Sequence, residues 1–229
     1  MTADADLVRA VRDGLAELAD PVKAPQMQRY MRSTMPYRGV PTPGWRPLAR
    51  RLAASYPAAD VDTLVTTVRE LWHGARFREE RYVALALTGD RRYRQWQTPK
   101  LLPLYEELIV TGSWWDFVDE LAIRRVGPLL RDFPSELTPV VRGWALDGNL
   151  WRRRTAVICQ VGSKAATDTA LLAYCIERNL DDRDFFLRKG IGWALREHSK
   201  TDRRWVAEFV DAHRGLSGLS RREASKYLG

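Results

Sequence analysis

The sequence predicts an all-α fold built from helical repeats. Apolar residues recur at spacings of three and four almost throughout, as in Leu64, Val68, Leu71 and Trp72, whereas period-two alternation is nearly absent. Tryptophans at positions 72, 115, 151 and 193 are separated by 43, 36 and 42 residues. These separations lie close to the roughly 40–47-residue period of HEAT and armadillo repeats. We therefore expect a HEAT-like α-solenoid of antiparallel helix pairs with a concave basic face.

Helix boundaries can be predicted from breakers and caps. Prolines at positions 36, 41, 43, 57, 99, 128, 134 and 139 divide the pattern into short runs, which indicates about twelve to fourteen helices joined by tight turns. Ser113 with Asp116, and Ser220 with Glu223, have the spacing of N-terminal capping boxes. The basic stretch 89–94 is expected to be a loop. Because composition does not shift on either side of it, we expect residues 1–229 to form a single domain.

Composition restricts the class of protein. A chain of 229 residues with 45% hydrophobic and 29% charged residues is typical of a globular protein that needs no disulfides. Cys159 and Cys175 with three scattered histidines give no metal-ligand spacing, so we expect no metal and no cofactor. The net charge of +8 favours a polyanionic partner, although 31 of the 37 cations are arginines, which could also reflect coding bias.

Targeting signals are not evident in the sequence. The N-terminal segment MTADADLVRAVRDG carries acidic residues where a signal peptide needs cations, and the apolar run 101–110 contains Glu106 and Glu107. We expect a monomeric, cytoplasmic protein that does not contact membranes, that associates with the nucleoid if it binds DNA, and whose thiols are reduced.

The segment SWWDFVDE, residues 113–120, is the most unusual in the chain. If it is helical from Ser113, Trp115 and Asp119 lie on one face and Trp114 and Val118 form the adjacent stripe. A carboxylate beside an indole can stabilise a cation, the acid by Coulomb attraction and the ring by its negative face. The alternative is that both tryptophans belong to the core and both aspartates are solvated or cap the helix.

Three further segments combine aromatic and basic residues. NLWRRR, residues 149–154, places three arginines near a helix start, where an inward guanidinium could hold a phosphate or the run could be solvated. In KGIGW, residues 189–193, two glycines before Trp193 allow close approach, either of a ligand or of another helix. In QRYMR, residues 28–32, Tyr30 is flanked by cations, as in nucleic-acid grooves and on many helix surfaces.

Together, QMQRYMR, TGSWWDFVDELA, NLWRRRTA and KGIGWALREHSKT resemble the AlkD-like DNA alkylation repair glycosylases in order and spacing, over about residues 20–228. The resemblance implies a HEAT-like fold whose cationic face embraces duplex DNA. It also implies hydrolysis of the N-glycosidic bond of cationic alkylated purines, notably N3-methyladenine and N7-methylguanine, without the deep base flipping of most glycosylases.

The resemblance also assigns residue roles. It implies that Asp119 is the catalytic carboxylate, that Trp115 and Trp193 are its aromatic partners, and that Arg154 is an active-site arginine. Tyr30 matches an aromatic near the lesion strand. We expect the neighbouring cations to contact DNA as well: Arg152, Arg153, Arg188 and Lys189. Since WWD, WRRR and GIGW contain no lysine, a Schiff base with the sugar is not expected, and the enzyme should be monofunctional.

Two other functions stay open at this point. A HEAT-like scaffold could bind nucleic acid or protein without catalysis, with the same residues serving packing and surface roles. A glycosylase specialised for bulky adducts is also compatible, because open recognition of a lesion does not need a snug base pocket. Release of methylated purines, and a panel of substrates, would discriminate among the three.

Overall fold

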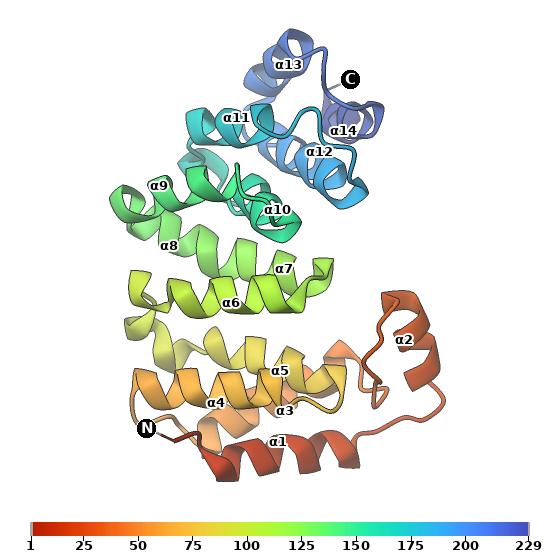
Figure 1. Cartoon of the computed structure of the whole chain (residues 1–229), viewed down its shortest axis with the longest axis vertical. Coiled ribbons are helices and arrows are strands. Elements are labelled where there is room, and N and C mark those ends of the chain that lie inside the picture. Colours follow the sequence, from red (N-terminus) through yellow and green to blue (C-terminus); the bar gives the residue numbers. More distant parts are fainter. Residues whose placement is uncertain (1, 229) are drawn as a thin grey trace. The chain divides into compact units, whose positions relative to one another are not determined.

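The computed structural model describes residues 2–228, and within them every regular element is helical, so the all-α prediction is confirmed. The described residues form fourteen α-helices, as the proline pattern predicted, with short 3₁₀ segments between some of them (Figure 1). The chain divides into two compact units, Met1–Trp96 and Gln97–Gly229. The division falls after Trp96, the last residue of a 3₁₀ segment, Arg91–Trp96, so residues 91–94 of the expected loop are 3₁₀ helix instead.

The first unit is a stack of amphipathic helices. Its helices are α1 (Ala5–Glu17), α2 (Ala24–Met31), α3 (Thr42–Ser55), α4 (Val61–His73) and α5 (Arg78–Thr88). The Asp60 carboxylate caps α4 by accepting from the Thr63 N–H, and the predicted apolar stripe of this helix, including Leu64 and Trp72, is buried. Helices α4 and α5 pack side by side in this unit (Figure 1).

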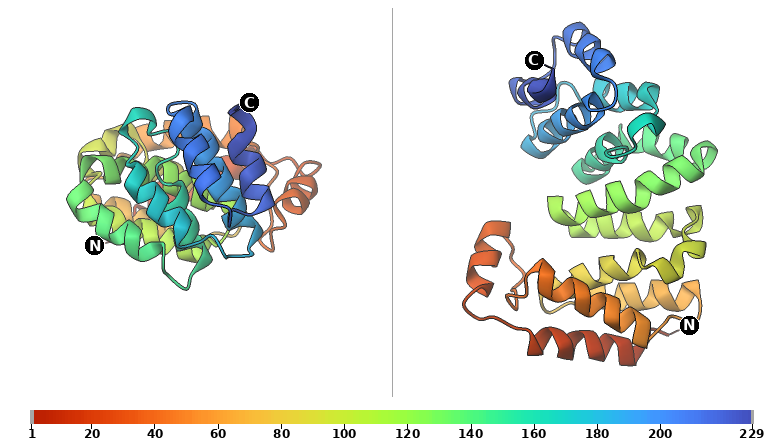
Figure 2. Two further views of the ribbon diagram at one scale, coloured as in Figure 1. Left: turned by 90° about the horizontal axis from the view of Figure 1, so that it is seen from above. Right: turned by 180° about the vertical axis from the view of Figure 1, so that it is seen from behind.

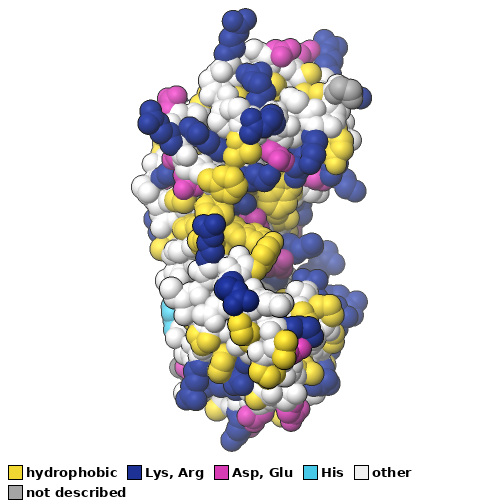
Figure 3. Space-filling model, turned by 90° about the vertical axis from the view of Figure 1, so that its right-hand side faces the viewer, with side chains coloured by type: hydrophobic (Ala, Val, Ile, Leu, Met, Phe, Trp, Pro, Cys, Tyr) yellow, Lys and Arg dark blue, Asp and Glu magenta, His cyan; other side chains and the backbone are white. Residues whose placement is uncertain are grey.

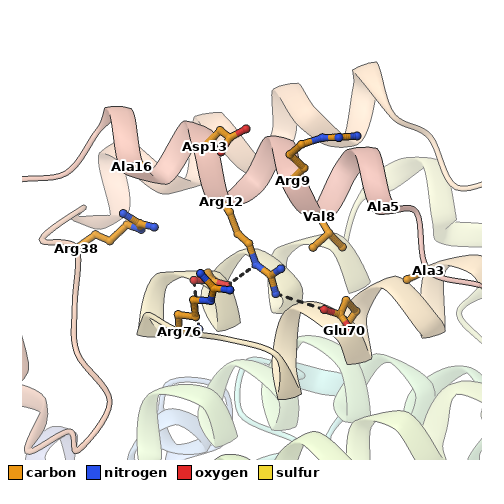
Figure 4. A pocket seen from close by; sticks show the side chains of 11 residues that line it. Ala3, Ala5, Val8, Arg9, Arg12, Asp13, Ala16, Arg38, Glu70 and Arg76 are labelled. Atoms are coloured by element: carbon orange, nitrogen blue, oxygen red, sulfur yellow. Dashed lines mark hydrogen bonds and ion pairs between the residues drawn. The ribbon is translucent and has the colours of Figure 1, made fainter.

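Two buried carboxylates at the start of α5 tie the first unit together. Glu79 accepts the backbone N–H groups of Arg38, Gly39 and Val40 at 2.9–3.0 Å. Glu80 accepts from Arg12 of α1 at 3.1 Å. Figure 4 shows Arg12 reaching from α1 to Glu70 as well, beside a cavity of about 530 Å³. These bonds connect α1, the 38–40 loop and α5, so they stabilise the unit.

The second unit is also built from packed helices. Its α-helices are α6 (Leu102–Gly112), α7 (Trp115–Leu121), α8 (Gly127–Asp132), α9 (Pro134–Trp144), α10 (Leu150–Ile158), α11 (Thr169–Glu177), α12 (Phe185–Ser199), α13 (Arg203–Ala212) and α14 (Gly218–Ala224). Helix α10 packs against α7, α9 and α12, and α12 packs against α13 and α14. Figures 1 and 2 show α10 and α12 next to one another within this unit.

Helices α7 and α8 are joined by a π-helical segment, Ala122–Val126. The Gly127 N–H bonds back to the Ala122 carbonyl, and Pro128 has no N–H to give to the next carbonyl along the helix. A Cβ on Gly127 would lie 2.1 Å from the Cys159 carbonyl oxygen, so only glycine permits this approach of the segment to the end of α10. This π-helical segment begins directly after α7, the helix that carries Asp119.

Three local predictions were wrong. Ser113 does not cap α7: it ends α6 with φ +44°, and α7 begins after Trp114. Ser220 lies inside α14, whose N-cap is Ser217, three residues earlier. Pro139 lies inside α9 rather than breaking it. The carbonyl that loses its donor there belongs to Ser135, which is exposed, so water can hydrate that carbonyl.

Residues 2–228 contain neither a candidate membrane-spanning helix nor a candidate metal-binding cluster. None of the helices there is both long and apolar enough to cross a membrane. Among the same residues, no group of three or more His, Cys, Asp or Glu side chains is arranged to hold a metal ion. Cys159 and Cys175 are buried free thiols, and burial raises the pKa of Cys175 to about 12.

Candidate active site

The second unit brings Asp119 of α7 and Arg154 of α10 into direct contact. The Arg154 guanidinium donates from Nε to Oδ1 and from Nη2 to Oδ2 of Asp119, each at 2.8 Å. This is a bidentate ion pair, the geometry that binds a carboxylate most strongly. The two residues are 35 positions apart in the chain, so the pair exists only because α7 packs against α10.

Local sequence explains how Arg154 reaches this position. The Asn149 side chain caps α10 by accepting from the Trp151 and Arg152 N–H groups, which sets the start of the helix. A third bond runs from Arg154 Nη1 to the Phe186 carbonyl oxygen in the first turn of α12. The Arg154 side chain is only 4% exposed, and its guanidinium makes two hydrogen bonds to α7 and one to α12.

Gly190 of α12 leaves the space that this guanidinium occupies. A Cβ at this position would lie 3.0 Å from Arg154 Nη1 and 3.3 Å from the Ile158 side chain. Gly192 has a different role, because a Cβ there would lie 2.5 Å from the Glu223 Cβ and 2.9 Å from the Ser220 carbonyl oxygen of α14. Of the two explanations for this glycine pair, tight helix packing applies to Gly192, whereas Gly190 admits the arginine.

Burial sets the electrostatics of the carboxylate. The Asp119 side chain is 16% exposed, and burial raises the pKa of its carboxyl above the ordinary value for aspartate. The hydrogen bonds and positive charge of Arg154 oppose that rise, and the nearby Asp116 adds to it. Arg154 therefore stabilises the ionised form of a carboxylate that burial would otherwise favour as the neutral acid.

The two predicted aromatic partners lie on α7, which carries Asp119, and on α12, which packs against the helix of Arg154. Trp115 lies four residues before Asp119 on α7, so the two share a helix face. Trp193 lies three residues after Gly190 on α12, one turn beyond the glycine that contacts Arg154. Both indoles are half-buried. That both rings face the Asp119–Arg154 pair, and their catalytic roles, stay predictions.

A second aromatic cluster next to the pair was not predicted. The rings of Trp114, Trp151 and Phe186 contact each other with centroids 5.3–6.3 Å apart, and the exposed Phe185 packs edge-on against Phe186 at 5.5 Å. The sequence suggested only that Trp151 marks the helical repeat and that Trp114 belongs to the core or to a stripe beside Trp115. The signal in the sequence was the pair of adjacent phenylalanines, Phe185 and Phe186, directly after the Asp184 N-cap.

The other predicted DNA-binding cations of this unit are paired within the protein. Arg152 bonds Glu106 at 2.8 Å and Asp147 at 2.9 Å, and Arg153 bonds Asp182 at 2.9 Å. Arg188 donates to the Asp182 carbonyl oxygen, and Lys189 bonds Glu223 at 2.7 Å. All four stay half-exposed, so these partners orient the cations without hiding them, and their contact with DNA stays a prediction.

Tyr30 belongs to the first unit. It lies near the end of α2 and is 78% exposed. Arg32 follows it as the C-cap with φ +48° and is also exposed. Figure 3 shows one side of the molecule, on which many Lys and Arg side chains stand among fewer Asp and Glu side chains and a group of hydrophobic ones. Such a surface is compatible with a polyanionic partner.

Comparisons with known proteins decide the family. The family model described as DNA alkylation repair enzyme matches residues 11–228. The chain belongs to the DNA alkylation repair enzyme family. A solved structure titled "Predicted DNA alkylation repair enzyme from Enterococcus faecalis" is similar to it with a TM-score of 0.83 and 29% sequence identity, over 92% of this chain and 97% of that one. A search of curated proteins gives no significant match.

Membership of the DNA alkylation repair enzyme family fixes the role in coarse terms. The chain is an enzyme that repairs alkylation damage, and its substrate is DNA. The family match spans all four segments on which the resemblance rested, from QMQRYMR to KGIGWALREHSKT. The helical-repeat fold predicted from the tryptophan spacing is the fold of this family's solved structure.

Proposed function

We propose that this member of the DNA alkylation repair enzyme family is a monofunctional glycosylase. It hydrolyses the N-glycosidic bond of cationic alkylated purines such as N3-methyladenine and N7-methylguanine in duplex DNA and leaves an abasic site. The observation that carries the proposal is the Asp119 carboxylate, held by bidentate bonds from Arg154 of α10. Helix α7 also carries Trp115, and Trp193 lies on α12, which packs against α10.

The chemistry of the substrate matches a single ionised carboxylate. A purine alkylated at N3 or N7 already carries positive charge, so it leaves as a neutral base and needs no general acid. Positive charge then grows on the deoxyribose as the C–N bond breaks. Asp119 stabilises that oxocarbenium-like centre and orients the attacking water, while the faces of Trp115 and Trp193 attract the same charge. Sugar hydrolases, by contrast, generally need a paired acid and base.

Arg154 acts in this proposal as a positioning residue. Its bonds to both Asp119 oxygens fix the direction of the carboxylate and favour its ionised form. The phosphate contact expected from the arginine run 152–154 stays a prediction, but the 4% exposure of the Arg154 side chain does not favour it. The half-exposed Arg152, Arg153, Arg188 and Lys189 are better placed to contact phosphates, and Tyr30 offers an exposed aromatic surface.

The direct test is release of bases from alkylated duplex DNA by the purified protein. We expect free N3-methyladenine and N7-methylguanine, measured by chromatography, and abasic sites that become strand breaks only after alkali treatment. A panel that adds bulky N3 and N7 adducts would define the range of lesions. Binding to alkylated DNA with no base release, under conditions in which a known glycosylase releases bases, would instead support the non-catalytic scaffold.

The monofunctional mechanism makes a separate prediction. Because no lysine lies in the elements that carry Asp119, Arg154 and Trp193, apart from Lys189, which bonds Glu223, no covalent imine with the sugar should form. Borohydride added during turnover should therefore trap no protein–DNA adduct, as judged by gel electrophoresis beside a bifunctional glycosylase as the positive control. A trapped adduct of the full-length protein would contradict the hydrolytic mechanism.

A further inference from the structure

Gly190 lies on the part of α12 that faces Arg154. A Cβ at this position would lie 3.0 Å from Arg154 Nη1 and 3.3 Å from the Ile158 side chain, closer than Cβ atoms ordinarily approach other atoms. Arg154 and Ile158 are one turn apart on α10, so both contacts come from the same face of that helix. Helices α10 and α12 pack against each other (Figure 1). The missing side chain at position 190 therefore sets how closely the guanidinium can approach α12.

The same glycine leaves the Phe186 carbonyl open to Arg154. A helical Cβ points toward the N-terminus of its helix, so a side chain covers the turn that precedes it. For position 190 that turn contains Phe186, whose carbonyl oxygen accepts from Arg154 Nη1. A side chain at position 190 would compete with the guanidinium for the space beside this carbonyl. Gly190 thus permits both the position of Nη1 and the bond that Nη1 makes.

The bond to Phe186 restrains the guanidinium in addition to its two bonds to Asp119. Nε and Nη2 donate to the two carboxylate oxygens at 2.8 Å, and Nη1 donates to α12. An arginine side chain has several rotatable bonds, and holding each donor removes part of that freedom. Because all three nitrogens are engaged, the plane of the guanidinium cannot turn without breaking a bond. The direction in which Arg154 presents Nε and Nη2 to Asp119 therefore depends on α12.

A second set of bonds ties the start of α12 to α10. Asp182 accepts from Arg153 Nη2 at 2.9 Å and, through its other oxygen, from the Asp184 N–H at 2.7 Å. Asp184 in turn caps α12 by accepting from the Phe186 N–H. Arg153 and Arg154 are neighbours on α10, so two adjacent arginines hold the first turn of α12. These bonds fix the place of the carbonyl that receives Arg154 Nη1.

We propose that Gly190 is a positioning residue for base excision, because it lets α12 hold Arg154 in the orientation that directs the Asp119 carboxylate. The inference rests on the function proposed above, in which the ionised carboxylate stabilises positive charge on the reacting sugar. Gly190 has no side chain of its own, so it acts only through Arg154. Gly192 is packed against α14 instead and has no part in this arrangement.

Gly190→Ala tests the proposal, with Gly192→Ala as the matched control on the same helix. The added methyl group should displace Arg154 Nη1, so single-turnover excision of N7-methylguanine should slow about ten- to hundredfold, the size of a lost charge-assisted hydrogen bond. Weaker support from Arg154 should also raise the pKa of Asp119 further and move the acid limb of the rate profile to higher pH. Gly192→Ala should reduce stability and leave the acid limb in place. An acid limb at the parental pH in folded Gly190→Ala would overturn the proposal.

Arg154→Lys provides a second test, because lysine lacks the Nη1 atom that the new methyl group would meet. In this background Gly190→Ala should change the rate by less than about twofold and leave the acid limb of Arg154→Lys where it is. Circular dichroism below the melting temperatures establishes that the variants are folded. Equal effects of Gly190→Ala in the parent and in Arg154→Lys would show that the methyl group acts through helix packing, and would overturn the positioning role.

A measurement without turnover separates this inference from the proposed function. The ¹³C signal of the Asp119 carboxyl, assigned with Asp119→Asn in the full-length protein, reports ionisation whether or not bases are released. Gly190→Ala should move this titration to higher pH, and Gly192→Ala should not. A shifted titration in a protein that releases no bases would overturn the glycosylase function and keep the effect of Gly190 on Asp119. An unshifted titration in Gly190→Ala would overturn the positioning role itself.

Discussion

Asp119 and Arg154 depend on each other more than either depends on its own helix. A buried carboxylate without its partner would become protonated. A buried guanidinium without its partner would lower the stability of the fold, by about 3–5 kcal/mol when one member of such a pair is removed. Together they form a bonded pair with the charge of Asp119 directed by two hydrogen bonds. A sequence motif can identify the two residues, but only the packing of α7 on α10 reveals that they touch.

The pair predicts a pH dependence. Excision needs ionised Asp119, so the rate should fall as the pH drops through the pKa of this carboxyl, which burial raises above the ordinary value. In Arg154→Gln the opposing effect of the guanidinium is lost, so the pKa should rise further and the acid limb of the single-turnover profile should move to higher pH. Arg154→Lys, which keeps the charge, should move it less. If the acid limb of folded Arg154→Gln stays where it is in the parent, Arg154 does not control the ionisation of Asp119.

Trp193 predicts a smaller effect on the rate. An indole facing a developing cation contributes about 0.5–2 kcal/mol, so Trp193→Ala should slow single-turnover excision by about two- to thirty-fold, and Trp193→Phe should slow it less. Trp205→Ala is a suitable control, because Trp205 stacks on Phe209 in α13 and carries no catalytic assignment. Equal losses in the Trp193 and Trp205 variants would indicate a general packing effect and remove Trp193 from the mechanism.

At the scale of helices, two glycine substitutions should have opposite effects on stability, because only one of the two glycines lies where helices pack closely. Gly192→Ala would place a Cβ against Glu223 and the Ser220 backbone, so the free energy of unfolding should fall by about 1–3 kcal/mol. Gly143→Ala lies in α9 with nothing within 4 Å of the added Cβ, so stability should rise by about 0.5–1 kcal/mol. Denaturant unfolding measures both. An unchanged or increased stability of Gly192→Ala would show that α12 and α14 do not pack this closely.

Periodicity predicted the helices themselves, but their ends were harder to place. The stripe that includes Leu64 and Trp72 is buried as expected, because the spacing of apolar residues directly reflects which helix face meets the core. Ser113 and Ser220 have the residue spacing of caps, yet Ser113 terminates the preceding helix and Ser217 caps α14. Serine suits several positions around a helix end, so the pattern alone cannot select one.

For the whole molecule, the net charge of +8 indicated a polyanionic partner, and family membership makes that partner DNA. The sequence could not predict which acidic side chain each cation would pair with. Arg152 meets Glu106, a residue far from it in sequence, and Lys189 meets Glu223 in the last α-helix. Such pairs form between elements that are distant along the chain. Spacing rules describe neighbours on one helix only, so they cannot reveal them.

The measurement that tests the central claim most directly is single-turnover base excision by Asp119→Asn. Asparagine keeps the size of the side chain but loses the negative charge, so we expect excision of N7-methylguanine to fall about 10²–10³-fold while binding to lesion DNA is retained. Asp116→Asn, on the same helix and also half-buried, is the matched control and should lose much less. Near-parental excision by folded Asp119→Asn would contradict the account, because the carboxylate at its centre would then be dispensable.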